Sequence, residues 1–242
     1  MTELRISVAD TIDAVDAGEW DACANPGARA GIAKDEGGAR TERPAAQSSA
    51  APEPAYNPFI SHAFLAALEQ SNSVGPRTGW QPRHVLAHTA EGTLIAAAPC
   101  YLKSHSRGEY VFDHGWAEAY ARAGGSYYPK MQVAVPFTPA AGRRLLVRDT
   151  ADSESIARAL ASGLVEICKI CGASGVHVTF APEAEFRLLG ELGYLQRTDQ
   201  QFHWDNRGFA TFDEFLGALT ARKRKTIRRE RHDALEIGRA HV

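Results

Sequence analysis

The stretch YYPKMQVAVPFTPAAGRRLL, residues 127–146, decides the fold. Its apolar part predicts a strand over residues 131–137, which two prolines close, and a loop follows over residues 138–144. Residues 153–172 then carry apolar side chains at helical spacing, with a glycine at the expected end of the helix. Beyond the helix, apolar and other residues alternate over 176–180, which predicts a second strand. This region therefore reads as strand, loop, helix and strand.

The residues before this region predict a short strand, two helices and a pair of strands. The strand lies near residues 4–8, and a stretch containing Trp20 is a candidate helix. Ser61 is a plausible N-cap for the second helix. Residues 82–88 and 93–104 read as two strands joined by a hairpin turn, whereas residues 109–129 read as aromatic and irregular.

The residues after residue 180 predict further elements, namely a short helix over 183–192, a strand near 196–205 and a helix that starts at Thr211. A basic helical segment follows this last helix. We expect residues 25–56, which are rich in Ala, Gly, Pro and Ser, to be a disordered insertion.

The charge of the chain is uneven. Among the 242 residues the formal net charge is −2, but residues 221–231, ARKRKTIRRER, alone carry +6, which leaves −8 for the rest. No apolar run reaches the roughly 20 residues that span a bilayer, and the start of the chain does not resemble a signal peptide. We therefore expect a cytoplasmic protein without a transmembrane segment.

The cysteines do not form a metal-binding pattern. Only Cys168 and Cys171 of the four are close in sequence, and no second pair of Cys or His residues lies near them. A tetrahedral metal site needs about four ligands. We therefore expect small apolar core residues and no metal.

The order of predicted elements resembles the acetyltransferase superfamily, known as GNAT. This resemblance implies an α/β (α+β) fold with a mixed, splayed sheet flanked by helices, here with a basic C-terminal helix. Residues 131–137 would be the fourth strand and residues 176–180 the fifth. In such folds the donor sits in the splay between these two strands, with the loop after the fourth strand around a phosphate-bearing group.

Five motifs narrow the resemblance to one group. They resemble the FemAB-like predicted N-acyltransferases, which are similar to proteins that attach amino acids to peptidoglycan precursors. The motifs are NPFISHAFLAALEQS (57–71), GWQPRH (79–84), YLKSHSRGEYVFDHGW (101–116), the stretch at 127–146 and ARKRKTIRRER (221–231).

The resemblance also implies how the chain is divided. Residues 1–24 and 57–208 would form one GNAT-like domain, and residues 209–235 would lead to a second domain that is missing or barely begun. Residues 236–242 read as a translated sequencing adapter, which we expect to be a non-native tail.

The resemblance places the donor site on the fourth strand and its loop. Backbone N–H groups around Val133 and Val135 would bind the oxyanion. Thr138, Gly142, Arg143 and Arg144 would bind the donor's phosphate, although the same residues also suit a surface turn. The loop has one glycine where coenzyme A loops have two, so acyl-coenzyme A and aminoacyl-tRNA both remain candidate donors.

The segment at 113–116 and the residues shortly after it suit an acceptor pocket. Asp113 and His114 are candidate general bases, because one offers a carboxylate and the other an imidazole. Trp116, Tyr127, Tyr128 and Lys130 are candidate contacts to the acceptor amine. Aromatic loops also fold onto their own domain, which is the alternative here.

The basic segment has three interpretations. It is a solvated helix, a surface for tRNA, or a surface for an anionic lipid-linked precursor. The candidate phosphate contacts are Arg222, Lys223, Arg224, Lys225, Arg228 and Arg229.

The leading hypothesis is an enzyme that transfers an acyl or aminoacyl group to an amine, with a peptidoglycan precursor as one candidate acceptor. One alternative is a non-catalytic binding module for a cell-wall precursor or RNA. Another is a fragment that is inactive without its second domain.

Overall fold

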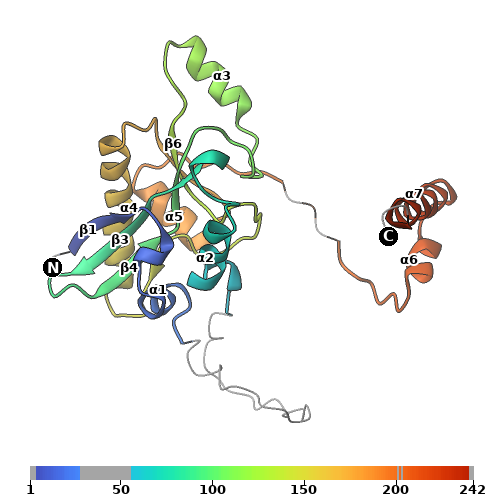
Figure 1. Cartoon of the computed structure of the whole chain (residues 1–242), viewed down its shortest axis with the longest axis horizontal. Helices are drawn as coiled ribbons and strands as arrows, with labels where there is room; N and C mark the ends of the chain where they lie inside the picture. Colours follow the sequence, from blue (N-terminus) through green and yellow to red (C-terminus); the bar gives the residue numbers. More distant parts are fainter. Residues whose placement is uncertain (1–3, 28–55, 201, 203, 240–242) are drawn as a thin grey trace, which may run out of the picture. The chain divides into compact units, whose positions relative to one another are not determined.

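The computed structural model describes residues 4–27, 56–200, 202 and 204–239. These residues belong to two compact units, Met1–Gln196 and Arg197–Val242 (Figure 1). The expected insertion at 25–56 falls almost wholly outside the described residues, as does the end of the expected tail at 240–242.

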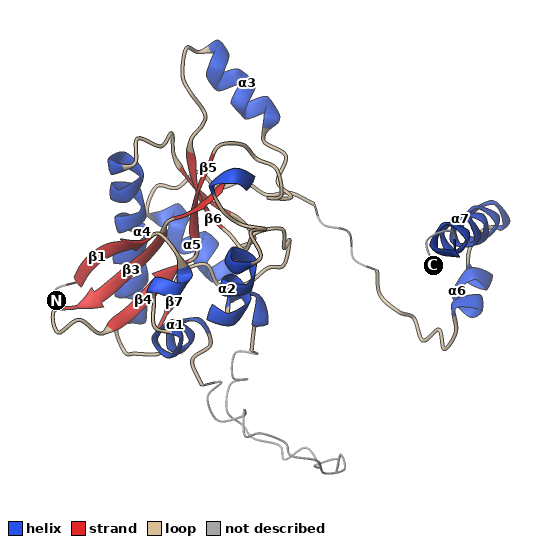
Figure 2. Ribbon diagram, viewed as in Figure 1, coloured by secondary structure: helices blue, strands red, loops and turns tan. Residues whose placement is uncertain are grey.

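The first unit is a mixed α/β structure with two four-stranded sheets (Figure 2). The first sheet is antiparallel, in the order β1 (Leu4–Ala9), β3 (His84–Thr89), β4 (Leu94–Ala98) and β7 (Leu146–Val147). The second sheet has the order β2 (Trp80–Pro82), β5 (Cys100–Lys103), β6 (Lys130–Val133) and β8 (Val176–Val178). In the second sheet β6 and β8 run parallel and the other pairs are antiparallel. The mixed α/β fold expected from the sequence is confirmed.

One hairpin supplies strands to both sheets. The predicted strands at 82–88 and 93–104 are each interrupted, at Arg83 and at Pro99, and each continues into the other sheet. Pro99 has no N–H to donate to a ladder, so the regular pairing stops there. The Arg83 N–H still donates to the Cys100 carbonyl oxygen at 2.8 Å, which keeps the two arms of the hairpin together across the break.

Helices cover both faces of the first sheet. On one face α4 (Ser153–Ile170) buries Leu160 and Leu164 against Val85 and Ala87. The neighbouring residue, Leu86, points the other way and packs in a core with residues of α1 (Ala17–Ala24) and α2 (His62–Gln70), because successive strand residues alternate between faces. The remaining helices of this unit are α3 (His114–Arg122), α5 (Glu183–Glu191) and the short 3-10 turns Ile12–Ala14, Pro58–Ile60 and Pro76–Thr78.

The second unit contains α6 (Phe212–Ala218) and α7 (Ala221–Arg239). Thr211 is the N-cap of α6 as expected, and its side chain accepts a hydrogen bond from the Glu214 N–H at 3.2 Å. The basic segment forms the first part of α7.

Two expectations are corrected. Residues 109–129 contain helix α3, because alanines and long side chains follow Trp116 and favour a helix. The strand predicted near 196–205 does not form, and the described residues there have no regular structure. A strand is stable only when its backbone pairs with another, and none of the described strands pairs with this segment.

The packing of α4 predicts a difference between two of its apolar residues. Leu160 is fully buried and Ile170 is 79% exposed. We expect Leu160→Ala to lower the free energy of unfolding by about 2–5 kcal/mol, because it leaves a cavity. Ile170→Ala should change it by no more than about 0.5 kcal/mol. Urea unfolding followed by near-UV circular dichroism measures both, and equal effects would contradict the assigned packing.

Candidate functional site

The candidate site lies where β6 and β8 separate. The two strands pair in parallel as far as Val133 and Val178. Beyond them the Thr179 N–H still donates to the Val133 carbonyl oxygen at 3.2 Å, while the Ala134 N–H points to the other neighbour and donates to the Pro99 carbonyl oxygen at 3.1 Å. The pairing of β6 with β8 therefore ends just beyond Val133, where the resemblance to the acetyltransferase superfamily implies a splay.

The two expected oxyanion donors occupy different positions at this opening. Val133 lies within the ladder, between Cys100 and Val178. Val135 is buried and lies beyond the ladder, and its N–H donates no hydrogen bond to any described residue. Since buried N–H groups are nearly always paired, the Val135 N–H is a candidate donor to a ligand.

A strained turn follows this free N–H. The Thr138 N–H donates to the Val135 carbonyl oxygen at 3.3 Å, and Phe137 between them has φ 56°, where glycine is usual. The Phe137 N–H donates to the Gly108 carbonyl oxygen, and a Cβ on Gly108 would lie 2.5 Å from the Phe137 ring. Only glycine therefore fits at position 108, and the turn is held against the start of the segment that carries α3.

The loop after the turn is built around Arg144. This side chain is fully buried, and its guanidinium donates to the carbonyl oxygens of Ala140, Gly142, Arg143 and Thr179 at 2.7–3.1 Å. Glu185 accepts from the Arg144 N–H, and burial lowers the pKa of Arg144 to about 10. The guanidinium thus shapes the loop, which differs from the phosphate contact expected for it.

Arg143 also binds main-chain atoms. Its guanidinium donates to the carbonyl oxygens of Cys23, Ala24 and Val147. Beside it, Ala141 and Gly142 border a pocket of about 250 Å³. The pocket is lined by Ala24, Asn25, Pro26, Asn57, Ile60, Ala141, Gly142, Arg143 and Pro182.

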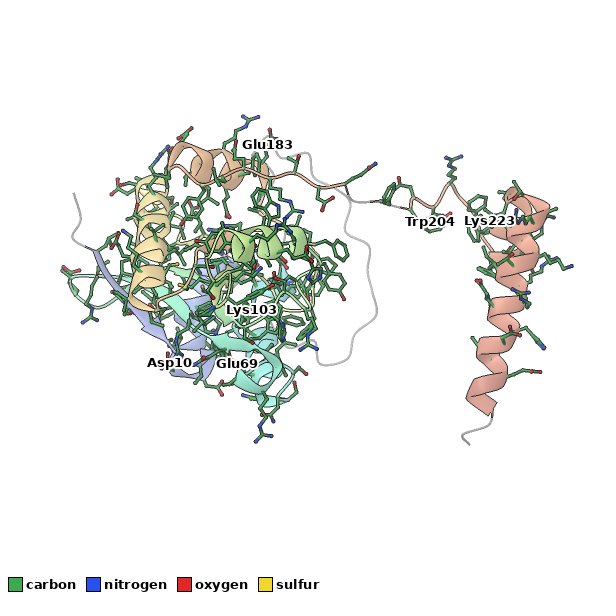
Figure 3. All side chains as sticks on the ribbon, turned by 90° about the horizontal axis from the view of Figure 1, so that it is seen from above. Asp10, Glu69, Lys103, Glu183, Trp204 and Lys223 are labelled. Atoms are coloured by element: carbon green, nitrogen blue, oxygen red, sulfur yellow. The ribbon has the colours of Figure 1, made fainter. Side chains whose placement is uncertain are left out.

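A second feature of the site is a pair of buried lysine side chains. Lys103 on β5 and Lys130 on β6 are direct cross-strand partners, and both are fully buried (Figure 3 labels Lys103). The Lys103 ammonium lies 3.5 Å from the centre of the Trp80 ring on β2. Two like charges opposite each other destabilise a sheet unless something neutralises them.

Two buried carboxylates neutralise this pair of lysines. Lys130 Nζ binds Glu109 Oε2 at 2.7 Å and Asp113 Oδ2 at 2.6 Å. The other oxygen of Glu109 lies 3.8 Å from Lys103 Nζ, and that ammonium also donates to the Arg107 carbonyl oxygen at 3.1 Å. The four charges cancel, and we refer to Lys103, Glu109, Asp113 and Lys130 as the buried charge cluster.

The cluster shifts the pKa values of its members in different directions. Burial, with Lys130 nearby, lowers the pKa of Lys103 to about 7, against the attraction of Glu109. Burial raises the pKa of Glu109. Burial also acts to raise the pKa of Asp113, but the hydrogen bonds from Lys130 and Tyr127 outweigh it and hold that pKa below its ordinary value. Asp113 is therefore an ionised partner of Lys130 and a weak base.

The other expected acceptor residues divide into two groups. Tyr127 donates to Asp113 Oδ2 at 2.9 Å, and Tyr128 shares a 2.8 Å hydrogen bond with Ser106, so both join the cluster. His114, next to Asp113, is exposed at the start of α3. Trp116 is 60% exposed on the same helix, away from the buried side chains.

Lys103 and Glu109 were not predicted as site residues. Both lie within the motif at 101–116, so their proximity to Asp113 in sequence is the signal that could have identified them. Their burial depends on pairing between β5 and β6, which the motif alone does not reveal.

The basic residues on α7 are mostly unpaired. Arg224 donates to the Leu219 carbonyl oxygen at 3.1 Å, and Arg228 lies 3.9 Å from Asp213. Within the described residues, the side chains of Arg222, Lys223, Lys225 and Arg229 make no ion pair (Figure 3 labels Lys223).

Among the residues that the structure describes, no group of three or more His, Cys, Asp or Glu side chains is arranged to hold a metal ion. No helix in the described part of the chain is long and apolar enough to cross a membrane.

The chain is thus a mixed α/β protein in which a strand pair opens beside a buried polar cluster. The chain belongs to the FemAB-like family, since the family profile, described as peptidoglycan biosynthesis/recognition, matches residues 11–240. The resemblance seen in the motifs is thus confirmed. No curated protein matches the sequence. Among solved structures, a Trypanosoma brucei acetyltransferase is similar over 84% of this chain and 100% of that chain, with 13% identity and a TM-score of 0.39.

The pKa of Lys103 makes stability depend on pH. The folded-state pKa of about 7 lies below the ordinary value of 10.5, so the unfolded chain binds more protons between these values and stability rises with pH there. We expect the free energy of unfolding to contain a rise between about pH 7 and 9 that Lys103→Met removes. Urea unfolding across this range measures it. Lys169→Met, at an exposed lysine, is the control and should keep the rise.

Proposed function

We propose that the chain is an N-acyltransferase, which transfers an acyl or aminoacyl group from an activated donor to an amine of a peptidoglycan precursor. The observation that carries this proposal is the free N–H of Val135, placed where β6 and β8 separate. Membership of a family described by peptidoglycan biosynthesis/recognition supports the acceptor class.

The proposed reaction is a direct attack. The acceptor nitrogen forms a bond to the acyl carbonyl carbon, and the carbonyl oxygen becomes an oxyanion that accepts a hydrogen bond from the Val135 N–H. The nitrogen loses one proton to a base, and the bond to the donor's sulfur or oxygen then breaks with its electron pair. The donor leaves as a thiol or a hydroxyl after it takes up a proton.

His114 is the proposed base. Asp113 is held by Lys130 and Tyr127 in the buried charge cluster, so its carboxylate is poorly placed to accept a substrate proton. His114 is the next residue and is exposed to solvent. An accessible imidazole suits this role. Tyr127 and Tyr128, which are half-buried and follow α3 in the sequence, are the proposed acceptor contacts.

The donor is proposed to bind along the loop at 138–144. Because Arg143 and Arg144 bind carbonyl oxygens and the Gly142 N–H donates to the Phe180 carbonyl oxygen, the donor's phosphate would meet the backbone of Ala141 at the 250 Å³ pocket instead. Acyl-coenzyme A and aminoacyl-tRNA both carry such a phosphate. The unpaired cations of α7 favour a second phosphate-rich contact, either tRNA or an anionic lipid-linked precursor.

A binding module without turnover is the second candidate. The observation that favours it is the use of both loop arginines within the fold, which leaves fewer cations for a donor than the sequence suggested.

A thermal-shift titration with acetyl-coenzyme A and, separately, with bulk aminoacyl-tRNA tests the proposal. A donor that binds only the folded chain adds about 2.7 kcal/mol at 100 times its Kd, and the midpoint should rise accordingly. Free coenzyme A and deacylated tRNA are the controls. Binding of one donor, followed by acyl transfer to an amine of a peptidoglycan precursor, is the expected result.

A matched pair of variants tests the proposed role of the Val135 N–H. Val135→Pro removes the N–H, and we expect kcat to fall by about 10²–10³-fold, the usual loss for one oxyanion donor. Val135→Ala keeps the N–H and should retain most of the activity. Donor binding without transfer by the wild-type chain would instead identify a binding module.

A further inference from the structure

Helix α3 and the residues before it form an arm that leaves the body of the first unit (Figures 1 and 2). Four aromatic side chains along this arm are exposed, and the exposed fractions are large. They are Tyr110 (57%), Phe112 (75%), Trp116 (60%) and Tyr120 (45%). Scattered exposed apolar residues are ordinary, but four aromatics within eleven residues mark an interaction surface.

The arm is amphipathic. Phe112, Trp116 and Tyr120 follow one another at intervals of four, so the two on the helix share a face. His114, Glu118 and Arg122 recur at the same interval and lie on the opposite face. No residue of α3 is buried, and a helix of nine residues is marginal in water without a partner. We refer to Tyr110, Phe112, Trp116 and Tyr120 as the aromatic face.

The arm is fixed to the body at both ends. Glu109 and Asp113 on the outgoing side and Lys130 on the returning side belong to the buried charge cluster. Tyr120 packs over Gly125, where an added Cβ would lie 2.5 Å from its ring. The aromatic face is therefore presented by a braced support rather than by a loose loop.

We propose that the aromatic face inserts into the headgroup region of an anionic lipid membrane. Two observations favour a lipid surface over a protein groove. Residues 110–122 contain Trp, Tyr and Phe but no Leu, Ile or Met and a single Val, Val111, and this enrichment in aromatic over aliphatic side chains is typical of a membrane–water interface. Arg107, three residues before the first of these aromatics, is exposed, and exposed cations complement anionic headgroups.

The aromatic face lies on α3 and the residues before it, whereas the Val135 N–H lies on the segment after β6. Only the membrane contact of the arm is inferred, and it stands whether or not the chain catalyses transfer.

Co-sedimentation with vesicles of phosphatidylglycerol and phosphatidylethanolamine in equal parts tests the proposal. We expect the wild-type chain to bind, and the double variant Phe112→Ser, Trp116→Ser to bind at least about ten-fold more weakly, because each buried aromatic side chain contributes about a factor of ten or more. The matched control, Ile170→Ser with Leu195→Ser, removes two equally exposed apolar side chains elsewhere and should bind like the wild type.

A second measurement locates the contact without relying on the double variant. Brominated phospholipids quench tryptophan fluorescence at the membrane, and Trp20 and Trp80 are buried. We expect the quenching to persist in Trp204→Phe and to disappear in Trp116→Phe.

Three results would overturn the proposal. The first is no binding of the wild-type chain to these vesicles. The second is binding that the double variant leaves unchanged, or quenching that follows Trp204, which would place the contact on the second unit. The third is a dimer of the wild-type chain that the double variant converts to a monomer without vesicle binding, since the face would then bind a second copy.

Discussion

The pairing of Lys103 with Lys130 on adjacent strands is the constraint on which the site depends. Two fully buried cations cannot face each other across a ladder without buried anions to compensate them. Glu109 and Asp113 supply these anions, and both lie on the segment that connects the two strands. The connection is therefore held to the sheet at Glu109 and again at Asp113, and α3 projects from the residues between Asp113 and Lys130.

The same segment links the cluster to the sheet opening. Gly108, one residue before Glu109, accepts the Phe137 N–H and leaves room for its ring. The strained turn at Phe137 then positions the residues that begin at Val135, whose N–H is free. The buried charges, the arm and the stretch that carries the Val135 N–H are thus linked by contacts along one segment of the chain.

The fold was largely predictable because its main elements have clear periodicity. Helix α4 and the strands β6 and β8 follow from apolar spacing alone. The interruptions at Arg83 and Pro99 were not predicted, because a continuous apolar strand gives no sign of a change of sheet. The strand expected near 196–205 failed for a related reason, since an alternating pattern does not identify a partner strand.

The site was predictable only in part. Asp113, Tyr127, Tyr128 and Lys130 could be grouped because they are close in sequence, and the structure joins them. Lys103 and Glu109 require a tertiary pairing to become visible. Arg144 suggested a phosphate contact, since the sequence shows its charge but not the four carbonyl oxygens that surround it.

The most direct test of the buried charge cluster is amide hydrogen exchange on the wild-type chain and Lys130→Met. In the wild type, the cluster should protect the backbone amides of residues 109–113 and 127–130 from exchange. In Lys130→Met, the amides across residues 104–129 should lose their protection, whereas those of α4 should keep it. Unchanged exchange over 104–129, or an equal loss in α4, would contradict the view that these charges hold the arm and the site together.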